Sequence, residues 1–539
     1  MIVSTIPQKQ NQNIKFKGPM DGVITTSLAF LDTNPMADAT LTDLGSMVIP
    51  RTYIDTKKRN KYAGAETFFR ELTGTGIVCL SAGALAKGIA YVANKTIDSE
   101  TKINPNSWVT NDGINVMKNV WADSENSTEK FVSGMFKNIS GKDGSHNATW
   151  DKIDWNNIEW VDEKKWDKIK WNSKKFEGIH NKLKSEKSII NTMVELIEDK
   201  SIDKSDAKHI KDILESRITN AIKVNRSIDV AHTLSKTKYA TSVPNLLRDV
   251  FDVGRHVFNN KDINVEKALN KLVKINKVKT LGALGVASVL GLTNQYINRK
   301  ITEKRTGVKG FVGDVNYQDS VKKKETKKDN SLKFNIEKGI ATVGIAALAL
   351  GVMRISSPKQ FIKKLEFAGP VTSGNAIKTV YTATLMGRFL ASDNEDELRE
   401  SSFRDYFGFL NWLVLGGFAS KGVANIIDRK KSNLFNVDKE GKGVKHWFND
   451  LSLKSHKEIL AHGEKFAKAN IWKVNLHQAA GLAYKTAMLG VVLPMLNIIF
   501  TNRKDKKKKA LAINNQVKAP VIQNNKPNRS LVFKSFYHK

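Results

Sequence analysis

The sequence has 539 residues, of which 40% are apolar, and its 87 lysines and arginines against 54 aspartates and glutamates give a net charge of +33. The length fits several domains, and the apolar fraction is too low for a protein built mainly of membrane spans. The single cysteine, Cys79, excludes an internal disulfide framework and a cysteine-based metal site. The positive charge favours anionic partners, either lipid headgroups or nucleic acid.

The N-terminal segment, residues 1–60, is predicted to be loosely structured. It mixes asparagine, glutamine, threonine and proline without a sustained hydrophobic period. Its start lacks the apolar core of a cleavable signal peptide, so an internal apolar run would have to direct any membrane insertion.

A first apolar helix is expected within residues 61–98. Ala82, Ala86 and Ala90 recur there every four residues. Residues at that spacing share one helix face, and small side chains on it allow another helix to pack closely, in lipid or in water.

Residues 99–178 form a polar, tryptophan-rich region. Trp150, Trp155, Trp160, Trp166 and Trp171 recur every five or six residues. Steps of five residues turn by about 140° on an α-helix, so these rings cannot share one helical stripe. They predict either a small β insert, in which Trp155, Trp160 and Trp171 each share a strand face with the Ile two residues before, or a small satellite core. A tryptophan ladder also suits stacking on sugars or bases, or a lipid interface.

Residues 179–278 are predicted to form a soluble amphipathic helical bundle, since apolar residues such as Ile210, Ile213, Leu214 and Ile218 recur at helical spacing. Together with residues 99–178, this region is a candidate docking domain for a protein partner.

Residues 279–502 are predicted to form apolar helices joined by basic loops. The apolar runs are 281–292, 340–353, 367–390, 407–427 and 487–500. Gly285, Gly344 and Gly351 are expected at helix-packing faces. The first two runs are shorter than the roughly 20 residues that a membrane span needs, so they fit buried core helices or half-spans equally well.

The pair of runs at 367–427 has the charge pattern of a membrane-spanning hairpin. An acidic segment, 393–400, joins the two runs, and basic clusters flank the pair. Lys87, Lys378 and Lys421 lie within apolar runs, and we interpret them as snorkelling or edge residues rather than pore charges.

Lysine and arginine clusters beside the apolar runs are the predicted contacts with anionic lipid or nucleic acid. These are Lys322, Lys323, Lys324, Lys363, Lys364, Arg429, Lys430, Lys431, Arg503, Lys504, Lys506, Lys507, Lys508 and Lys509. The basic tail, 503–539, is expected to be disordered.

Sequence motifs of catalysis are missing. There is no phosphate-binding Gly-rich loop, dinucleotide fingerprint, His-Glu-x-x-His or Gly-x-Ser-x-Gly pattern, and the histidines are scattered. We also expect no carboxylate alone in an apolar setting that would tune it for acid–base work. The sequence therefore predicts no catalytic, cofactor or metal site.

The expected fold class is mainly α, with a soluble helical bundle and a set of short Gly/Ala-rich apolar helices. The leading hypothesis is a non-enzymatic, multi-helix membrane-associated protein whose lysine-rich loops face anionic lipid on the cytoplasmic side. One alternative is a soluble, basic nucleic-acid-binding or scaffold protein. Another is a pore-forming protein that is delivered in soluble form and then inserts, with the acidic hairpin tip as its motivating feature.

Overall fold

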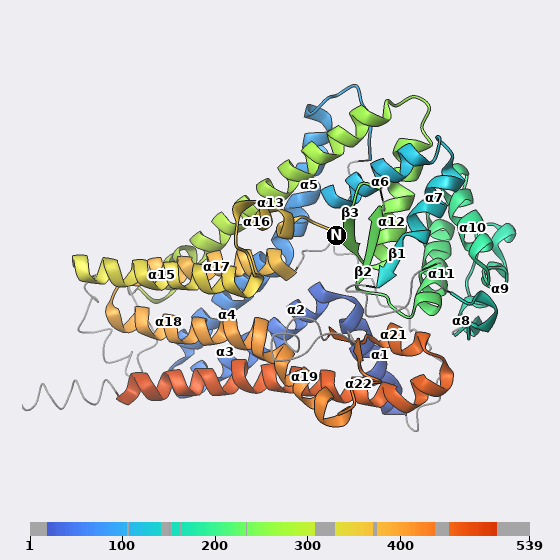
Figure 1. The fold of residues 1–539 in the computed structure, drawn as a ribbon. Coiled ribbons are helices and arrows are strands. Elements are labelled where there is room, and N and C mark those ends of the chain that lie inside the picture. Colours follow the sequence, from blue (N-terminus) through green and yellow to red (C-terminus); the bar gives the residue numbers. More distant parts are fainter. Residues whose placement is uncertain are drawn as a thin grey trace, which may run out of the picture. The chain divides into compact units, whose positions relative to one another are not determined.

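The structure is a computed structural model that describes residues 19–104, 107–141, 150, 153–161, 163–232, 234–307, 329–369, 374–436 and 452–503. The chain forms two units, Met1–Pro494 and Met495–Lys539, and every labelled element of Figure 1 belongs to the first. The described residues are mainly helical, as predicted.

Helices occupy much of the N-terminal segment that was expected to be loosely structured. They are α1 (Pro19–Thr33), α2 (Pro35–Asp43), the π-helical turn η1 (Leu44–Val48) and α3 (Ile49–Lys58). Pro35 and Pro50 lie in first turns, where a missing N–H group needs no partner. Several buried residues of these helices are polar, such as Ser46 and Arg51, which explains why no hydrophobic period marks them. The first 18 residues lie outside the described part.

A long helix with a central π-turn follows, made of α4 (Lys61–Thr75), η2 (Gly76–Ser81) and α5 (Ala82–Thr96). The Asn60 side chain caps it by accepting a hydrogen bond from the Ala63 N–H at 2.8 Å. Ala82, Ala86 and Ala90 are buried on α5, which packs against α13.

The part of the chain from 107 to 262 contains a small antiparallel sheet with strand order β1-β2-β3. Its strands are β1 (Ile139–Gly141), β2 (Ile228–His232) and β3 (Thr237–Thr241). Its helices are α6 (Asn111–Asp123), α7 (Thr128–Lys137), α8 (Glu163–Trp166), α9 (Ile179–Lys182), α10 (Glu186–Glu198), α11 (Lys204–Ile222), α12 (Val243–Val253) and the π-turn η7 (Gly254–Phe258). The β2–β3 hairpin interrupts the all-helical bundle predicted for residues 179–278. We call residues 107–262 the sheet-containing part.

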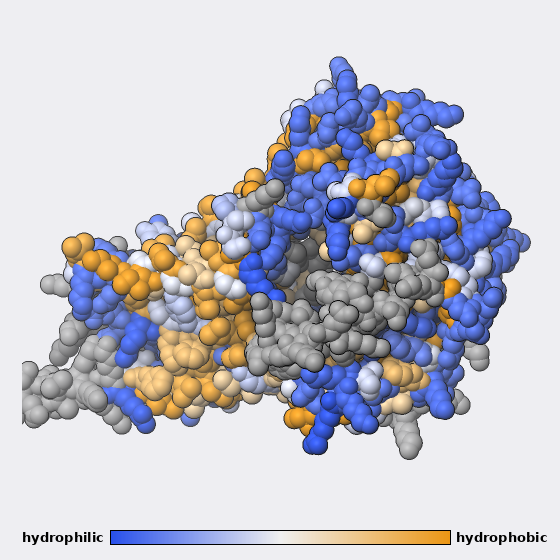
Figure 2. Space-filling view, in the orientation of Figure 1, coloured by the Kyte–Doolittle hydropathy of each residue, from blue (hydrophilic) through white to orange (hydrophobic). Residues whose placement is uncertain are grey.

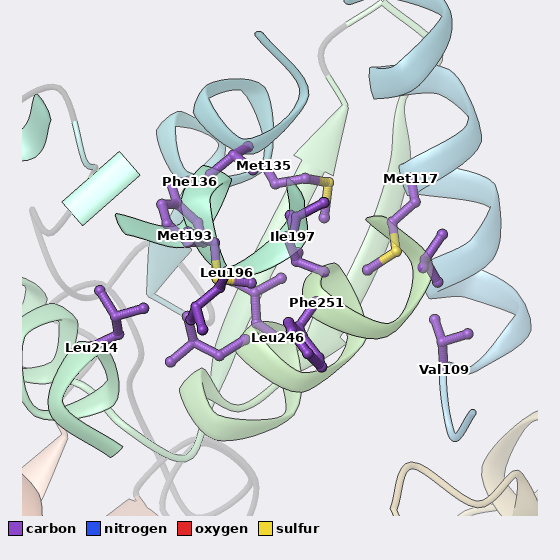
Figure 3. Close-up of a cluster of buried hydrophobic side chains, with 14 of the residues drawn as sticks. Val109, Met117, Met135, Phe136, Met193, Leu196, Ile197, Leu214, Leu246 and Phe251 are labelled. Carbon is purple, nitrogen blue, oxygen red and sulfur yellow. The ribbon is translucent and has the colours of Figure 1, made fainter. Parts of the chain in front are cut away.

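One hydrophobic core joins the elements of the sheet-containing part. Figure 3 shows side chains from α6, α7, α10, α11 and α12 meeting in it, among them Met117, Met135, Leu196 and Leu246. The same core extends to Ala90 of α5 and to Ile275 of α13. The two regions predicted separately, 99–178 and 179–278, therefore share a single core.

The tryptophan-rich segment wraps onto this core in short helical turns. Its described residues between 150 and 178 form the 3₁₀ turns η5 (Trp155–Asn157) and η6 (Lys174–Phe176) with α8, and no strand is found among them. The buried Trp150 contacts the rings of Phe136 and Trp155, with centroids 5.5 and 5.0 Å apart. The predicted β insert is thus absent from these residues, and the rings have the packing role of a satellite core.

The remaining elements begin with the 42-residue helix α13 (Val265–Thr306). They continue with α15 (Leu332–Met353), α16 (Pro358–Leu365), α17 (Gly374–Leu390), α18 (Glu395–Leu410), the π-turn η8 (Asn411–Leu415), α19 (Gly416–Ile427), β4 (Phe435–Asn436), β5 (Ser452–Leu453), α21 (His456–Ala461), α22 (Glu464–Lys485) and the π-turn η9 (Thr486–Val492). We call α4–η2–α5, α13, α15, α17 and α18 the apolar bundle. Helix α13 runs from the sheet-containing part along α5 and α17 (Figure 1).

Helices α13 and α17 approach each other closely because glycines lie between them. A Cβ atom on Gly387 would lie 2.2 Å from the Leu292 carbonyl oxygen, and one on Gly291 would lie 2.6 Å from Thr384 Oγ1. Only glycine fits at such separations, and small residues of this kind bring helix backbones together in membranes as well as in water.

A buried lysine ties α13 to the end of α5. Lys271 is 2% exposed, and its Nζ donates hydrogen bonds to the carbonyl oxygens of Asn94, Asp98 and Thr101 at 2.8, 2.9 and 2.7 Å. These carbonyls belong to the last turn of α5 and the loop after it, where no intrahelical donor remains. Lys271 therefore acts as a C-terminal cap supplied by another helix.

The outer face of the apolar bundle is hydrophobic. On α15, Ile340 and Val343 are each 68% exposed, and on α13, Leu281 and Val289 are more than half exposed. Figure 2 shows hydrophobic residues gathered over the apolar bundle, whereas hydrophilic residues dominate the visible face of the sheet-containing part. By length and composition alone, four helices could cross a membrane, namely 61–96, 265–306, 332–353 and 464–503.

The buried face of α13 within the apolar bundle is partly polar. Asn294, Gln295 and Asn298 are 4%, 6% and 2% exposed, whereas Tyr296 and Ile297 between them are 62% and 52% exposed. Over residues 294–298 the helix thus turns apolar side chains outward and amide side chains inward, the reverse of a helix on the surface of a water-soluble protein.

Candidate functional site

A network of buried arginines and carboxylates lies inside the apolar bundle. Its first centre is Glu71 of α4, which is 5% exposed. Its carboxylate accepts hydrogen bonds from Arg51 Nη1 of α3 at 3.3 Å, Arg70 Nη2 at 3.2 Å and Arg388 Nη2 of α17 at 3.2 Å. One carboxylate therefore holds guanidinium groups from three helices.

The second centre of the network is Asp405 of α18, which is 1% exposed. Its Oδ1 accepts hydrogen bonds from Arg388 Nη1 at 3.1 Å and from Arg404 Nε at 3.0 Å. Arg388 thus bridges Glu71 and Asp405, so that α3, α4, α17 and α18 are joined through one chain of ion pairs. We call these six residues the arginine network.

The arginines of the network outnumber the carboxylates that touch them by two. Two further carboxylates, Asp43 and Glu66, act on these arginines through space without an ion-pair contact among the described residues. Burial raises the pKa of Asp43 to about 7, although the hydrogen bond that Thr75 donates to it acts in the opposite direction. Buried charges are costly unless compensated, and these nearby carboxylates offset part of the positive charge of the arginines.

Some polar atoms of the network have no hydrogen-bond partner in the structure. They include Arg51 Nη2, Arg388 Nε and Asp405 Oδ2, together with Asn294 Nδ2 on the facing side of α13. Buried donors and acceptors of this kind are normally satisfied by water, an ion or a ligand. The network therefore has the unsatisfied groups expected of a binding site.

Several π-turns surround the network. Asp43 and Thr75 are the residues just before η1 and η2, and Arg51 Nε donates to the Leu489 carbonyl oxygen of η9 at 3.0 Å. The turns η1, η8 and η9 contact one another or their neighbouring helices. A π-turn frees backbone groups from the α-helical pattern, and such turns are frequent at functional sites.

The acidic segment 393–400, expected to be an exposed hairpin tip, is ion-paired. Arg299 of α13 contacts Asp393 at 2.7 Å and also contacts Glu397, while Arg59 contacts Glu400 at 2.7 Å. Glu397 and Glu400 are buried in the first turns of α18. The sequence pattern showed the acidic charge correctly, but its partners come from distant helices and could not be located.

The predicted lysine contacts fall into different environments. Lys363 contacts Asp112 of α6 at 2.6 Å, and Lys364 Nζ donates to the carbonyl oxygens of Met353 and Arg354 at 3.0 and 2.6 Å. Arg429 and Lys430 are exposed in the turn after α19, Lys431 is half-buried there, and Arg503 is exposed. Lys322, Lys323, Lys324, Lys504, Lys506, Lys507, Lys508 and Lys509 lie outside the described residues. The structure does not bring these clusters together in its described part.

Of the three glycines predicted at helix-packing faces, one contacts another helix and two face open space. Gly344 lies against Tyr406, whose hydroxyl would be 2.3 Å from an added Cβ and donates to the Ala341 carbonyl oxygen at 2.7 Å. Gly285 and Gly351 have no atom within 4 Å of an added Cβ and are exposed.

Sequence reasoning missed the arginine network. Glu71 and Asp405 are buried carboxylates, each of them paired with arginines that come from other parts of the sequence. A weak signal existed, because Arg388 lies near the end of a mostly apolar run, and a charge in such a run needs a partner. No group of histidine, cysteine or carboxylate side chains that could hold a metal occurs among the described residues.

No family model matches this chain, and no match was found among curated proteins or among solved structures. The arguments for function therefore rest on the residues and their geometry alone.

Proposed function

We propose that this protein is a non-enzymatic, membrane-integrated helical protein whose sheet-containing part stays in water. The observation that carries the proposal is the inverted pattern of α13, which buries Asn294 and Asn298 and exposes Val289 and Ile297. In water, each exposed large apolar side chain forgoes about 1.5–3 kcal/mol that burial would provide. A lipid environment removes that cost and favours polar side chains between helices.

The charge-free lengths of the helices suit a bilayer. No charged residue lies between Lys279 and Arg299 of α13 or between Lys338 and Arg354 of α15. The 22 residues of α15, which include Lys333, Glu337 and Lys338 in its first two turns, correspond to about 33 Å of helix, close to the thickness of a bilayer's hydrocarbon core. The charged residues at both ends of these stretches would lie at the two interfaces.

The long helix α13 would both cross the membrane and enter the water-exposed part. Its first turns contribute Leu269, Leu272 and Ile275 to the core of the sheet-containing part, and its later turns pack on α5 and α17. At 42 residues it is about twice as long as a span requires. Residues 99–278 would then be held at the membrane surface, where they could dock a protein partner.

Exposed basic residues support a contact with anionic lipid. Arg429 and Lys430 are free to meet headgroups, whereas Lys363 and Lys364 are engaged within the protein. Each basic residue near an anionic surface contributes about 1 kcal/mol of attraction. The positive-inside rule would place the short basic loops on the cytoplasmic side.

Membrane fractionation tests the proposal, and two matched variants sharpen it. The full-length protein should stay with membranes through high-salt and alkaline carbonate washes. Val343→Glu should reduce this retention strongly, because it places a charge on the outward face of α15. Leu234→Glu replaces a side chain that is 80% exposed in the β2–β3 turn and should leave retention unchanged. Complete extraction of the wild type by salt alone would refute integration.

The net charge of +33 favours one alternative, a soluble nucleic-acid-binding protein. Such a protein would bind DNA or RNA with an affinity that falls steeply with salt. A wild-type protein that is released by salt, binds nucleic acid in this way and tolerates Val343→Glu would support the alternative.

A further inference from the structure

An aspartate, a histidine and a serine meet at the turn between β2 and β3, in the sheet-containing part. The His232 ring, at the end of β2, contacts Asp123 through Nε2 and Ser235 Oγ through Nδ1, each at 2.7 Å. The serine is exposed, whereas the histidine is 7% exposed. A carboxylate, an imidazole and a hydroxyl in this order can activate the hydroxyl as a nucleophile. We propose that Ser235 is a covalent acceptor that takes an acyl group from an acyl thioester.

The backbone fixes where the imidazole ring carries its proton. The Ser235 N–H donates to His232 Nδ1 at 3.1 Å, and a backbone amide nitrogen can only donate there. Nδ1 is therefore the unprotonated nitrogen of the neutral ring, and Nε2 donates its proton to Asp123. The Ser235 hydroxyl, which also contacts Nδ1, then points its own proton at the ring. The two ring nitrogens exchange the places that they have in serine proteases, but the path of the proton is equivalent.

Hydrogen-bond donors surround the serine oxygen and would stabilise its anionic form. Asn119 Nδ2 donates to Ser235 Oγ at 2.8 Å, and the Thr237 hydroxyl lies 2.7 Å from the same atom. The Thr237 N–H also donates to it, at 3.4 Å. Because hydrogen bonds to an anionic oxygen are stronger than those to a neutral one, these donors lower the cost of removing the hydroxyl proton.

Two regular elements hold the group in place. Asn119 and Asp123 are four residues apart on α6, so both side chains project from one face of this helix. His232 and Thr237 pair with each other in the β2–β3 ladder. Asp123 therefore serves as a positioning residue, which orients the imidazole and stabilises its protonated form, while His232 is the base.

The exposure of Ser235 selects the class of donor. At an exposed site the leaving group must depart with little help, and a thiol has a pKa of about 8.5, far below that of an alcohol. Thiolates of low pKa leave readily, so a thioester is a better donor here than an ordinary ester.

The proposed reaction is a single acyl transfer. A bond forms between Ser235 Oγ and the carbonyl carbon while the carbon–sulfur bond breaks, and the hydroxyl proton passes through His232 Nδ1 to the departing thiolate. The products are an ester on the serine and a free thiol, so the step needs no oxidant or reductant. Each chain reacts once without turnover, and the inference holds whether or not the apolar bundle lies in a membrane.

Peptide mapping of the full-length protein tests the proposal. The purified protein is incubated with acetyl-coenzyme A and quenched in acid, and hydroxylamine then separates acetyl-serine, an ester that it cleaves, from acetyl-lysine, an amide that it spares. Ser235 should be acetylated at least about ten-fold faster than the exposed Ser205, whose hydroxyl is 3.5 Å from His209 Nε2, too far for a strong hydrogen bond. Equal rates at the two serines would overturn the proposal.

Two variants separate activation of the serine from simple exposure. His232→Gln removes the base and should slow acetylation of Ser235 by about 100-fold. The wild-type rate should rise between about pH 5 and 8, since only a neutral imidazole accepts a proton, and the variant should lose this pH dependence. A histidine that merely holds the turn would leave the rate and its pH profile unchanged in His232→Gln, and that result would overturn the proposal.

The second variant keeps the test decisive if His232→Gln fails to fold. Asp123→Asn changes a side chain that is 52% exposed, so the fold should tolerate it. The amide cannot stabilise a protonated imidazole, so acetylation of Ser235 should slow by about ten-fold or more. An unchanged rate in Asp123→Asn would equally refute the proposal.

Discussion

The replacement of Glu71 by glutamine offers the most direct test of the arginine network. Glutamine keeps the shape of the side chain and removes its charge. The change leaves Arg51, Arg70 and Arg388 without their shared carboxylate, although all three are less than 7% exposed. Because the site is buried and solvent does not screen it, the remaining guanidinium groups repel one another in a medium of low polarity.

The burial of all three arginines sets the size of this effect. Removing one partner from a buried ion pair costs about 3–5 kcal/mol of folding free energy. If the apolar bundle unfolds as one cooperative unit, such a loss corresponds to a fall of roughly 6–20 °C in melting temperature. The matched control is Glu125→Gln, since Glu125 is exposed and pairs with Lys130 at the surface of the sheet-containing part. Surface pairs contribute little, so this control should melt like the wild type.

Thermal unfolding followed by circular dichroism would measure both variants, in detergent where required. A double variant, Glu71→Gln with Arg388→Gln, should be less destabilised than the sum of the two single variants, because each removes a charge that the other leaves unpaired. If Glu71→Gln melts at the same temperature as Glu125→Gln, the carboxylate does not hold the network and the reasoning fails.

Two further changes test other parts of the structure. Burial alone would raise the pKa of Asp32, but its hydrogen bond with His456 and the charge of Arg226 lower that pKa to about 2. The folded pKa is therefore below the unfolded value, so the ionised carboxylate adds about 2 kcal/mol to the free energy of unfolding above pH 4, and this stability is lost as the pH falls towards 2. Asp32→Asn should melt lower than the wild type at pH 6, and the difference should disappear in acid. A difference that stays constant with pH would contradict the assignment. Gly387→Ala should lower the free energy of unfolding by about 1–3 kcal/mol or more, because its Cβ would meet the backbone of α13. Gly285→Ala should raise the free energy of unfolding by up to about 1 kcal/mol, because this glycine lies on an open helix face. The same sign for both glycine variants would show that α13 and α17 do not pack as described.

The sequence predicted the fold class, and it did so through local patterns. The mainly helical composition followed from hydrophobic periods such as that of Ile210 to Ile218, and the four-residue spacing of Ala82, Ala86 and Ala90 marked a face that is buried on α13. Of the two interpretations of the Trp repeats, the β insert is not confirmed, because rings on successive irregular turns, such as Trp150 and Trp166, can reach one core without any regular period.

The arginine network could not be predicted, since its members are distant in sequence. Arg51 and Arg388 are 337 positions apart, and only the packing of α3 and α17 around α4 brings both to Glu71. Each charge taken singly resembles the solvated edge of an apolar run. The helical nature of residues 19–58 was missed for a related reason, because their buried side chains include the polar groups that serve this network.

The cap that Lys271 places on α5 has a consequence for biosynthesis. The carbonyl oxygen of Asn94 accepts its hydrogen bond from Lys271, which lies 177 residues further along the chain. At a translation rate of 5–20 residues per second, that donor is made roughly 10–35 s later. During this interval the end of α5 must rely on water or on a helper protein for its hydrogen bonds. Truncated chains that stop before residue 271 should therefore be held longer by chaperones or by the insertion machinery than chains that include it.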